Sequence, residues 1–170
     1  MLGRMAYDRS AAVAYAHEWA FRRNPAYYDY QGIGGDCTNF ASQCLYAGAG
    51  VMDFTPDFGW YYIDPNDKAP AWTGVEYFFR YLTRLSPTPG PIAQLARLRD
   101  IMPGDFVQLR PAGSERFTHT QIVVRTGYPA TLRNTLVAAH SYDADNRPLS
   151  TYAFREARFL HVTGVWKQAD

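Results

Sequence analysis

A glycine-rich loop that runs directly into an apolar, helix-periodic segment constrains this chain more than any other feature. The stretch reads Gln31-Gly-Ile-Gly-Gly-Asp-Cys37-Thr-Asn-Phe-Ala-Ser-Gln-Cys-Leu-Tyr-Ala-Gly48. Beyond Cys37, apolar or small residues recur at the three- and four-residue spacing of one buried helix face: Phe40, Ala41, Cys44, Leu45 and Gly48. The sequence therefore predicts a buried helix that begins at Cys37 and is capped at its C-terminal end by Gly48.

Cys37 falls in the first turn of this predicted helix. Unpaired backbone N–H groups and the positive end of the helix dipole stabilise a thiolate there, and the thiolate is the form of cysteine that attacks carbonyls. Many buried cysteines are inert packing groups, so the position alone leaves both roles open. Asp36 is predicted to be the N-cap without a chemical role, because an adjacent carboxylate would raise the pKa of the thiol.

The 170 residues suit a single domain over positions 1–170. Seventeen basic residues are scattered among 16 acidic ones, which argues against a nucleic-acid partner. Cys37 and Cys44 lie two helical turns apart and cannot form a disulfide with each other. No apolar run approaches the roughly 20 residues of a membrane-spanning helix, so we expect a soluble monomer with no membrane insertion. The chain could also be an excised domain whose export signal lay upstream, and the sequence leaves this alternative open.

The periodicity changes from helical to alternating along the chain. Helices are expected over 8–22, with Asp8 as N-cap, and over 72–83. Between them, 49–71 is expected to form an irregular aromatic loop; 86–91 is a proline-rich connection and 92–99 a short helix or covering loop. Strands are expected over 103–109, 119–125, 136–141 and 158–166. Helices followed by strands indicate an α+β fold with a helix packed on a small antiparallel sheet.

A cysteine nucleophile needs a base and a group that orients the base. His119 is the best candidate base because it opens a predicted strand after a polar loop. If the strands around residue 130 pair as a hairpin, His119 lies opposite residue 141 within about two residues. His140 is therefore predicted to orient His119, with Asp143 as the alternative. The remaining histidines, His17 and His161, are expected to be structural.

The oxyanion of an acyl-transfer intermediate also needs hydrogen-bond donors. The backbone N–H of Cys37 is one candidate, and the side-chain amide of Gln31 is a second that could equally be an ordinary loop residue. Aromatic residues often line clefts, and four of them are predicted to contact substrate: Trp60, Tyr61, Tyr62 and Trp72. The histidines and cysteines do not have metal-ligand spacing, so no metal or other cofactor is expected.

Several blocks together resemble the bacterial "putative amidase" domain family, part of the broad papain-like group that includes the NlpC/P60 and CHAP wall hydrolases. They are Asp36-Cys-Thr-Asn-Phe-Ala-Ser-Gln43, Gly59-Trp-Tyr-Tyr62, Pro103-Gly-Asp105, His119-Thr and Ala138-Ala-His-Ser-Tyr-Asp143. The resemblance implies a papain-like α+β fold with Cys37 as nucleophile, His119 as base and His140 as third group. In NlpC/P60 relatives the third group lies nearer the base, about where Ala138 falls, so Asp143 stays open. An extracellular or cell-envelope location is also implied.

We therefore expect a cysteine amidase or peptidase that hydrolyses an amide through a thioester acyl-enzyme. By resemblance, the substrate is bacterial cell-wall peptide, or peptidoglycan. Acyl transfer to an amine or alcohol is the alternative if the aromatic cleft excludes water. A non-enzymatic wall-binding domain is the third possibility, and the presence of Cys37 and both candidate histidines counts against it.

Overall fold

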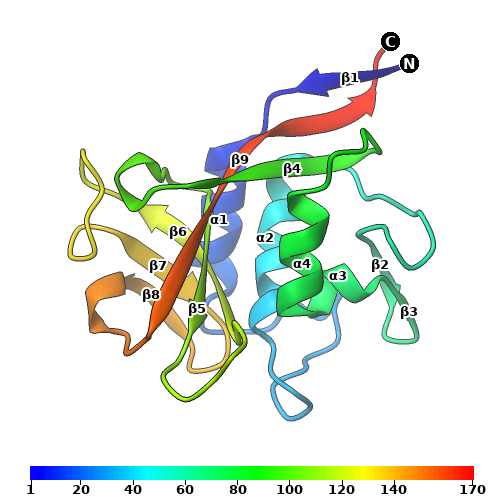
Figure 1. Cartoon of the computed structure of the whole chain (residues 1–170). Coiled ribbons are helices and arrows are strands. Elements are labelled where there is room, and N and C mark those ends of the chain that lie inside the picture. Colours follow the sequence, from blue (N-terminus) through cyan, green and yellow to red (C-terminus); the bar gives the residue numbers. More distant parts are fainter.

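The computed structural model describes residues 1–170 and has an α+β architecture built around a seven-stranded antiparallel sheet (Figure 1). The strand order is β1-β9-β5-β6-β7-β8, and β4 pairs with β9 off this path. The strands of this sheet are β1 (Leu2–Met5), β4 (Gly90–Ala96), β5 (Phe106–Arg110), β6 (His119–Arg125), β7 (Leu136–Ala139), β8 (Ala144–Pro148) and β9 (Glu156–Gln168). A separate hairpin joins β2 (Tyr62–Asp64) to β3 (Asp67–Lys68).

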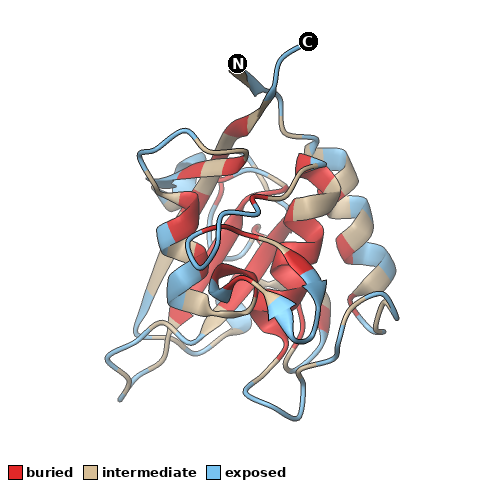
Figure 2. Ribbon diagram, turned by 90° about the vertical axis from the view of Figure 1, so that its right-hand side faces the viewer, coloured by how far each residue is buried: buried red, intermediate tan, exposed pale blue.

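The helices are α1 (Arg9–Trp19), α2 (Cys37–Ala49), α3 (Pro70–Thr73) and α4 (Val75–Leu82), with short 3-10 turns at Leu98–Asp100 and Leu149–Thr151. Figure 1 shows the two chain ends together at the top, where β1 pairs with the end of β9. Helix α2 is the centre of the molecule, because nearly all its residues are buried, including polar ones such as Thr38 and Ser42. Figure 2 shows this buried interior surrounded by exposed loops.

The alternation of β6 divides the core into two clusters on opposite faces of the sheet. Ile122 and Val124 belong to the larger cluster, which also contains Phe40 of α2. Val123 belongs to the smaller cluster on the far face. Because side chains alternate along a strand, His119 lies on the same far face as Val123. His119 therefore does not point toward the helix-packed face.

The predicted α+β class and the long helix after the glycine loop agree with the structure. Asp8 caps α1 as predicted, accepting a hydrogen bond from the Ala11 N–H at 3.0 Å, although α1 ends at Trp19 rather than near 22. The predicted C-cap of α2 was wrong. Gly50, with a φ of +73°, is the cap, whereas Gly48 lies inside the helix. A Cβ on Gly48 would lie 2.4 Å from the Tyr7 ring, so close packing explains this glycine.

The structure also corrects the prediction for the middle of the chain. The helix expected over 72–83 is divided at Gly74 into α3 and α4. The segment 92–99 was expected to be a helix or covering loop, but most of it is strand β4, which pairs with β9 from Gly90 to Ala96. This segment is a strand because it pairs with a strand distant in the sequence, and no local sequence pattern predicts that pairing. A papain-like affiliation stays a prediction. None of the helices has the length and apolar character needed to cross a membrane.

Candidate active site

Cys37 and His119 line the same open cleft, which has a volume of about 650 Å³. Cys37 is the first residue of α2, and His119 is the first residue of β6. The Cys37 Sγ lies 4.0 Å from the carbonyl oxygen of Thr118, the residue just before His119. A second contact ties the two elements together, since the hydroxyls of Thr38 and Thr120 lie 2.9 Å apart. The fold therefore brings the predicted nucleophile and base to one site.

The glycine loop and the turn after β7 fix the position of Cys37. The N–H of Asp36 donates to the Ser141 Oγ at 2.9 Å. Gly35 has a φ of +99°, and a Cβ there would lie 3.1 Å from the same hydroxyl. Ser141 and Tyr142 themselves adopt left-handed φ values of 61° and 66°. Such conformations persist only where the surroundings hold them, and here they form one wall of the cleft.

The Cys37 thiol is not a resting thiolate. Burial raises its pKa above the ordinary value of 9.0, although hydrogen bonds from the Thr120 backbone and the Thr38 hydroxyl act in the opposite direction. The thiolate stabilisation expected at a helix N-terminus is thus outweighed by desolvation. A nucleophilic role for Cys37 would therefore require a proton acceptor close to the thiol.

His119 carries no ring hydrogen bond to protein. Burial lowers its pKa from 6.5 to about 4, and the positive charge of Arg147 adds to this effect. Arg147 lines the same cleft. At neutral pH the imidazole is therefore uncharged and free to accept a proton, as a general base must be.

Two buried polar side chains near His119 lack hydrogen-bond partners, and sequence reasoning missed both. Gln121 follows His119 by two residues on the same strand face, is fully buried, and has neither amide atom paired. The hydroxyl of Tyr152 is also buried and makes no hydrogen bond within 3.5 Å, although Gln121 and Arg147 lie close enough to act on its pKa. The Tyr152 ring centroid lies 6.2 Å from that of His119. A buried polar group without a hydrogen bond lowers the stability of the fold, so two such groups beside His119 indicate a functional role for this position. A glutamine two residues after the candidate base, on the same strand face, was the available signal.

His140 does not reach His119, which corrects the prediction that it orients the base. Its Nδ1 donates to the carboxylate of Asp36, and its Nε2 lies 2.8 Å from the carbonyl oxygen of Trp19. The ring also stacks on Phe40, with centroids 3.9 Å apart. The predicted register was close: Ile122 pairs with Ala138, which continues to place His119 opposite residue 141. A one-residue offset along a strand reverses the face, so His140 points toward the helices.

The other carboxylates near the site are also occupied. Asp143, the alternative third group, forms an ion pair with Arg23 at 2.8 Å and does not line the cleft. Asp36 occupies the N-cap position of α2, but its side chain makes no capping bond, which corrects its predicted role. It accepts hydrogen bonds from the Tyr30 N–H, the Asn39 amide and His140. Asp36 thus links the glycine loop, α2 and β7 beneath the nucleophile.

The two candidate oxyanion donors lie at the cleft. Gln31 lines it with an exposed side chain, whose Oε1 accepts a long hydrogen bond of 3.5 Å from Arg23. Its amide NH2 group makes no hydrogen bond within the protein. The Cys37 N–H is at the first helical position, where a backbone donor has no partner within the helix.

The four aromatic residues predicted to bind substrate do not line the cleft. Trp60 and Trp72 are fully buried in the core, where their indole N–H groups donate to Ser42 and Asn39. Tyr62 is buried beside them, and Tyr61 packs near Phe54 instead. The prediction was wrong because buried polar residues on α2 satisfy the indoles, which lets the aromatic loop fold into the core.

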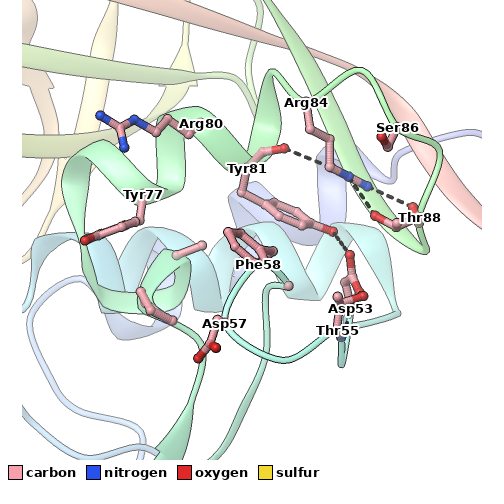
Figure 3. A pocket seen from close by; sticks show the side chains of 13 residues that line it. Asp53, Thr55, Asp57, Phe58, Tyr77, Arg80, Tyr81, Arg84, Ser86 and Thr88 are labelled. Atoms are coloured by element: carbon pink, nitrogen blue, oxygen red, sulfur yellow. Dashed lines mark hydrogen bonds between the residues drawn. The ribbon is translucent and has the colours of Figure 1, made fainter.

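A second cavity of about 670 Å³ lies between α4 and the loop around Asp53 (Figure 3). Several of its polar groups are hydrogen-bonded to one another. The Tyr81 hydroxyl donates to Asp53 at 3.2 Å, and the Arg84 guanidinium donates to Thr88. The cavity contains no cysteine or histidine. We therefore place the candidate active site at the cleft that contains Cys37. No group of three or more His, Cys, Asp or Glu side chains could hold a metal ion.

Comparison with known proteins gives a family match over residues 6–163, to a family described as "Putative amidase domain". The chain is also 34% identical over 143 residues to YhbB, an uncharacterized protein of Bacillus subtilis strain 168. This match covers 83% of the chain but 43% of YhbB, so the chain spans less than half the length of that relative. No solved structure matches the chain.

Proposed function

The chain belongs to the family of putative amidase domains, and we propose on that premise that it is a cysteine-dependent amidase that cleaves peptide-type amide bonds. One observation carries the proposal: a cysteine at a helix start and an uncharged histidine at a strand start line one open cleft. This combination supplies both the nucleophile and the base that acyl transfer requires.

In the proposed reaction the Cys37 Sγ attacks the amide carbonyl carbon while the His119 ring takes the thiol proton. The Cys37 N–H and the Gln31 side-chain amide donate hydrogen bonds to the oxyanion. The C–N bond then breaks, the leaving amine receives the proton from His119, and a thioester remains on Cys37. Water, deprotonated by His119, releases the acid and restores the thiol.

Gln121 takes the positioning role that a third group fills in such sites. It shares a strand face with His119, and its amide has donors and an acceptor available. A hydrogen bond from this amide would fix the tautomer and direction of the ring. This assignment replaces His140, whose ring nitrogens are both engaged elsewhere.

A cell-wall peptide is the substrate class that we propose, in line with the resemblance to wall hydrolases. A dry aromatic cleft would have favoured acyl transfer, but the aromatic residues concerned lie mainly in the core. The cleft is open, so water can reach the thioester. These features support hydrolysis over transfer.

The test is peptide release from purified peptidoglycan, with Cys44→Ala as the matched control for Cys37→Ala. Cys44 lies on the same helix, is fully buried, and has a thiol pKa raised well above 9.0 by burial. We expect Cys37→Ala and His119→Ala to lower the rate by at least about 1000-fold, since a nucleophile and its base act as a unit. Cys44→Ala should stay within about threefold of the parent. Undiminished release by Cys37→Ala would refute the cysteine mechanism.

A further inference from the structure

Arg147 is the one charged side chain in the cleft apart from the titratable Cys37 and His119, and no Asp or Glu lines it. The nearby carboxylates already have partners: Asp143 pairs with Arg23, and Asp145 pairs with His17. Arg147 forms no ion pair. A partly buried cation without a counter-charge, beside a nucleophile and its base, needs an explanation.

The Arg147 side chain is held in place rather than left mobile. Its Nε donates to the Thr151 hydroxyl at 2.8 Å, and one terminal nitrogen, Nη2, donates to the Thr151 carbonyl at 3.0 Å. The guanidinium also lies 3.8 Å from the centroid of the Tyr152 ring. These contacts leave Nη1 without a hydrogen-bond acceptor within 3.5 Å, although the Tyr152 hydroxyl lies close enough for Arg147 to act on its pKa. A fixed guanidinium with free N–H groups is suited to a carboxylate, because little side-chain entropy is lost on binding.

We propose that Arg147 binds a carboxylate of the substrate, so that the preferred substrate is a peptide-type amide with a free carboxylate near the scissile bond. This inference rests on the proposed function and narrows its substrate class. The carboxylate can be the C-terminal one of a peptide or an acidic side chain. Both present the same pair of oxygens to Arg147.

Carboxylate binding would also change the base. After burial, the charge of Arg147 is the second cause that lowers the pKa of His119. A bound carboxylate offsets that charge, so His119 becomes more basic when such a substrate is present. Substrates with a carboxylate would thus gain in the chemical step as well as in binding.

The experiment measures peptide binding to the Cys37→Ala variant by calorimetry, which requires no turnover. Three peptides differ only in their carboxylates. The first has a free C-terminal acid and a glutamine, the second has a C-terminal amide and a glutamate in place of the glutamine, and the third has a C-terminal amide and the glutamine, so it carries neither carboxylate. We expect at least one carboxylate peptide to bind ten or more times tighter than the neutral one. Adding Arg147→Met should abolish this difference and change the affinity for the neutral peptide less than about threefold.

Two further variants complete the test. Arg97→Met is the matched control, since Arg97 is an exposed residue outside the cleft that pairs with Asp100. Arg147→Lys keeps the charge but not the planar fork, so it should retain part of the preference for carboxylate peptides. This variant replaces Arg147→Met in the test if Arg147→Met proves unstable. Equal binding of all three peptides, or an equal loss for all three in Arg147→Met, would overturn the proposal.

Failure of the proposed function gives a different result. Carboxylate-dependent binding without any peptide release by the parent protein would leave the Arg147 assignment intact and remove the amidase assignment. Peptide release that is equally fast from the acid and neutral peptides would leave the amidase assignment intact and remove the Arg147 assignment. A shift of the acid limb of kcat/KM to higher pH in Arg147→Met is the additional readout that links Arg147 to His119.

Discussion

At the residue scale, the site depends on how burial changes two titratable groups. Burial raises the pKa of the Cys37 thiol and lowers that of His119 to about 4, so both rest in the uncharged form near neutrality. A preformed thiolate and imidazolium pair would require the reverse order of pKa values. In the proposed mechanism, proton transfer to His119 therefore accompanies attack on the substrate rather than preceding it.

Gln121 offers a test in which stability and activity change in opposite directions. Replacing Gln121 with Leu removes a buried amide that makes no hydrogen bond within 3.5 Å and interacts only weakly with the Tyr152 hydroxyl, so the free energy of unfolding should stay the same or rise. Because the ring of His119 then loses its positioning group, kcat should fall about tenfold or more, with KM little changed and a changed pH profile. Urea unfolding and steady-state kinetics measure the two effects.

Gln108→Leu is the control for this prediction. Gln108 is also fully buried, but its amide donates to the Val75 carbonyl and Thr120, and its oxygen accepts from Arg158. This variant should lose stability because those partners become unpaired. If Gln121→Leu behaved as Gln108→Leu does, with a loss of stability and unchanged kcat per folded molecule, Gln121 would be structural.

His140 should prove important for stability instead of chemistry. His140→Ala removes one buried hydrogen-bond partner of Asp36, while the Tyr30 N–H, the Asn39 amide and Arg23 at 3.8 Å remain, so the loss of that bond should cost about 1–3 kcal/mol. His17→Ala removes a more exposed pair with Asp145 and should cost about 1 kcal/mol or less. Thermal melting compares the two. A loss of kcat in folded His140→Ala comparable to that of His119→Ala would restore His140 to the catalytic group.

At the element scale, the junction of the glycine loop with α2 decides where the thiol lies. Gly34 and Gly35 both have positive φ values, which let the chain enter the helix with Cys37 at its first position. The same junction is tied to the turn after β7 through the Asp36 N–H and the Ser141 hydroxyl. Loop, helix and strand therefore hold the nucleophile jointly.

Gly35→Ala should disturb this junction, whereas Gly32→Ala should not. An alanine at 35 would adopt an unfavourable φ of +99° and approach Ser141, at a cost of about 1–2 kcal/mol. Gly32 has nothing within 4 Å of an added Cβ and no positive φ. Urea unfolding gives the stability change, and peptide release reports the position of Cys37. Equal stability and equal peptide release in the two variants would show that the junction does not require a glycine at position 35.

At the scale of the whole molecule, one sheet separates two hydrophobic clusters, and the candidate active site lies where the first residue of the inner strand β6 comes near the start of α2. His119 belongs to the far face with the smaller cluster, and Cys37 comes from the helix side. His119 is the first residue of β6 and Cys37 the first of α2, so both residues lie at the ends of their elements and line one cleft.

The low pKa of His119 should make the native protein sensitive to acid. Between pH 6.5 and about 4 the unfolded chain binds a proton at this residue that the native state does not bind, so stability falls as pH falls and levels off below pH 4. His119→Gln removes this contribution. The free energy of unfolding of the variant minus that of the parent should therefore increase by about 1–3 kcal/mol as the pH is lowered from 7 to 4. Urea titrations across that range measure the difference; a constant offset would contradict the lowered pKa.

The sequence by itself determined the local features of this protein. Glycine conformational freedom, helical spacing and strand alternation predicted α2 from Cys37, β6 from His119 and the register that follows the turn near residue 130. Each of these depends on residues close together in the chain, so the pattern is present before any packing occurs.

Only the tertiary structure decided which side chains share the site. A one-residue offset turned His140 toward Asp36, and buried partners on α2 drew Trp60 and Trp72 into the core. Arg147 lines the cleft because β8 lies on the same side of the sheet as β6, and Gln121 is fully buried on the strand face that carries His119. Long-range pairing and the satisfaction of buried polar groups determine such positions, and neither is encoded in a local pattern.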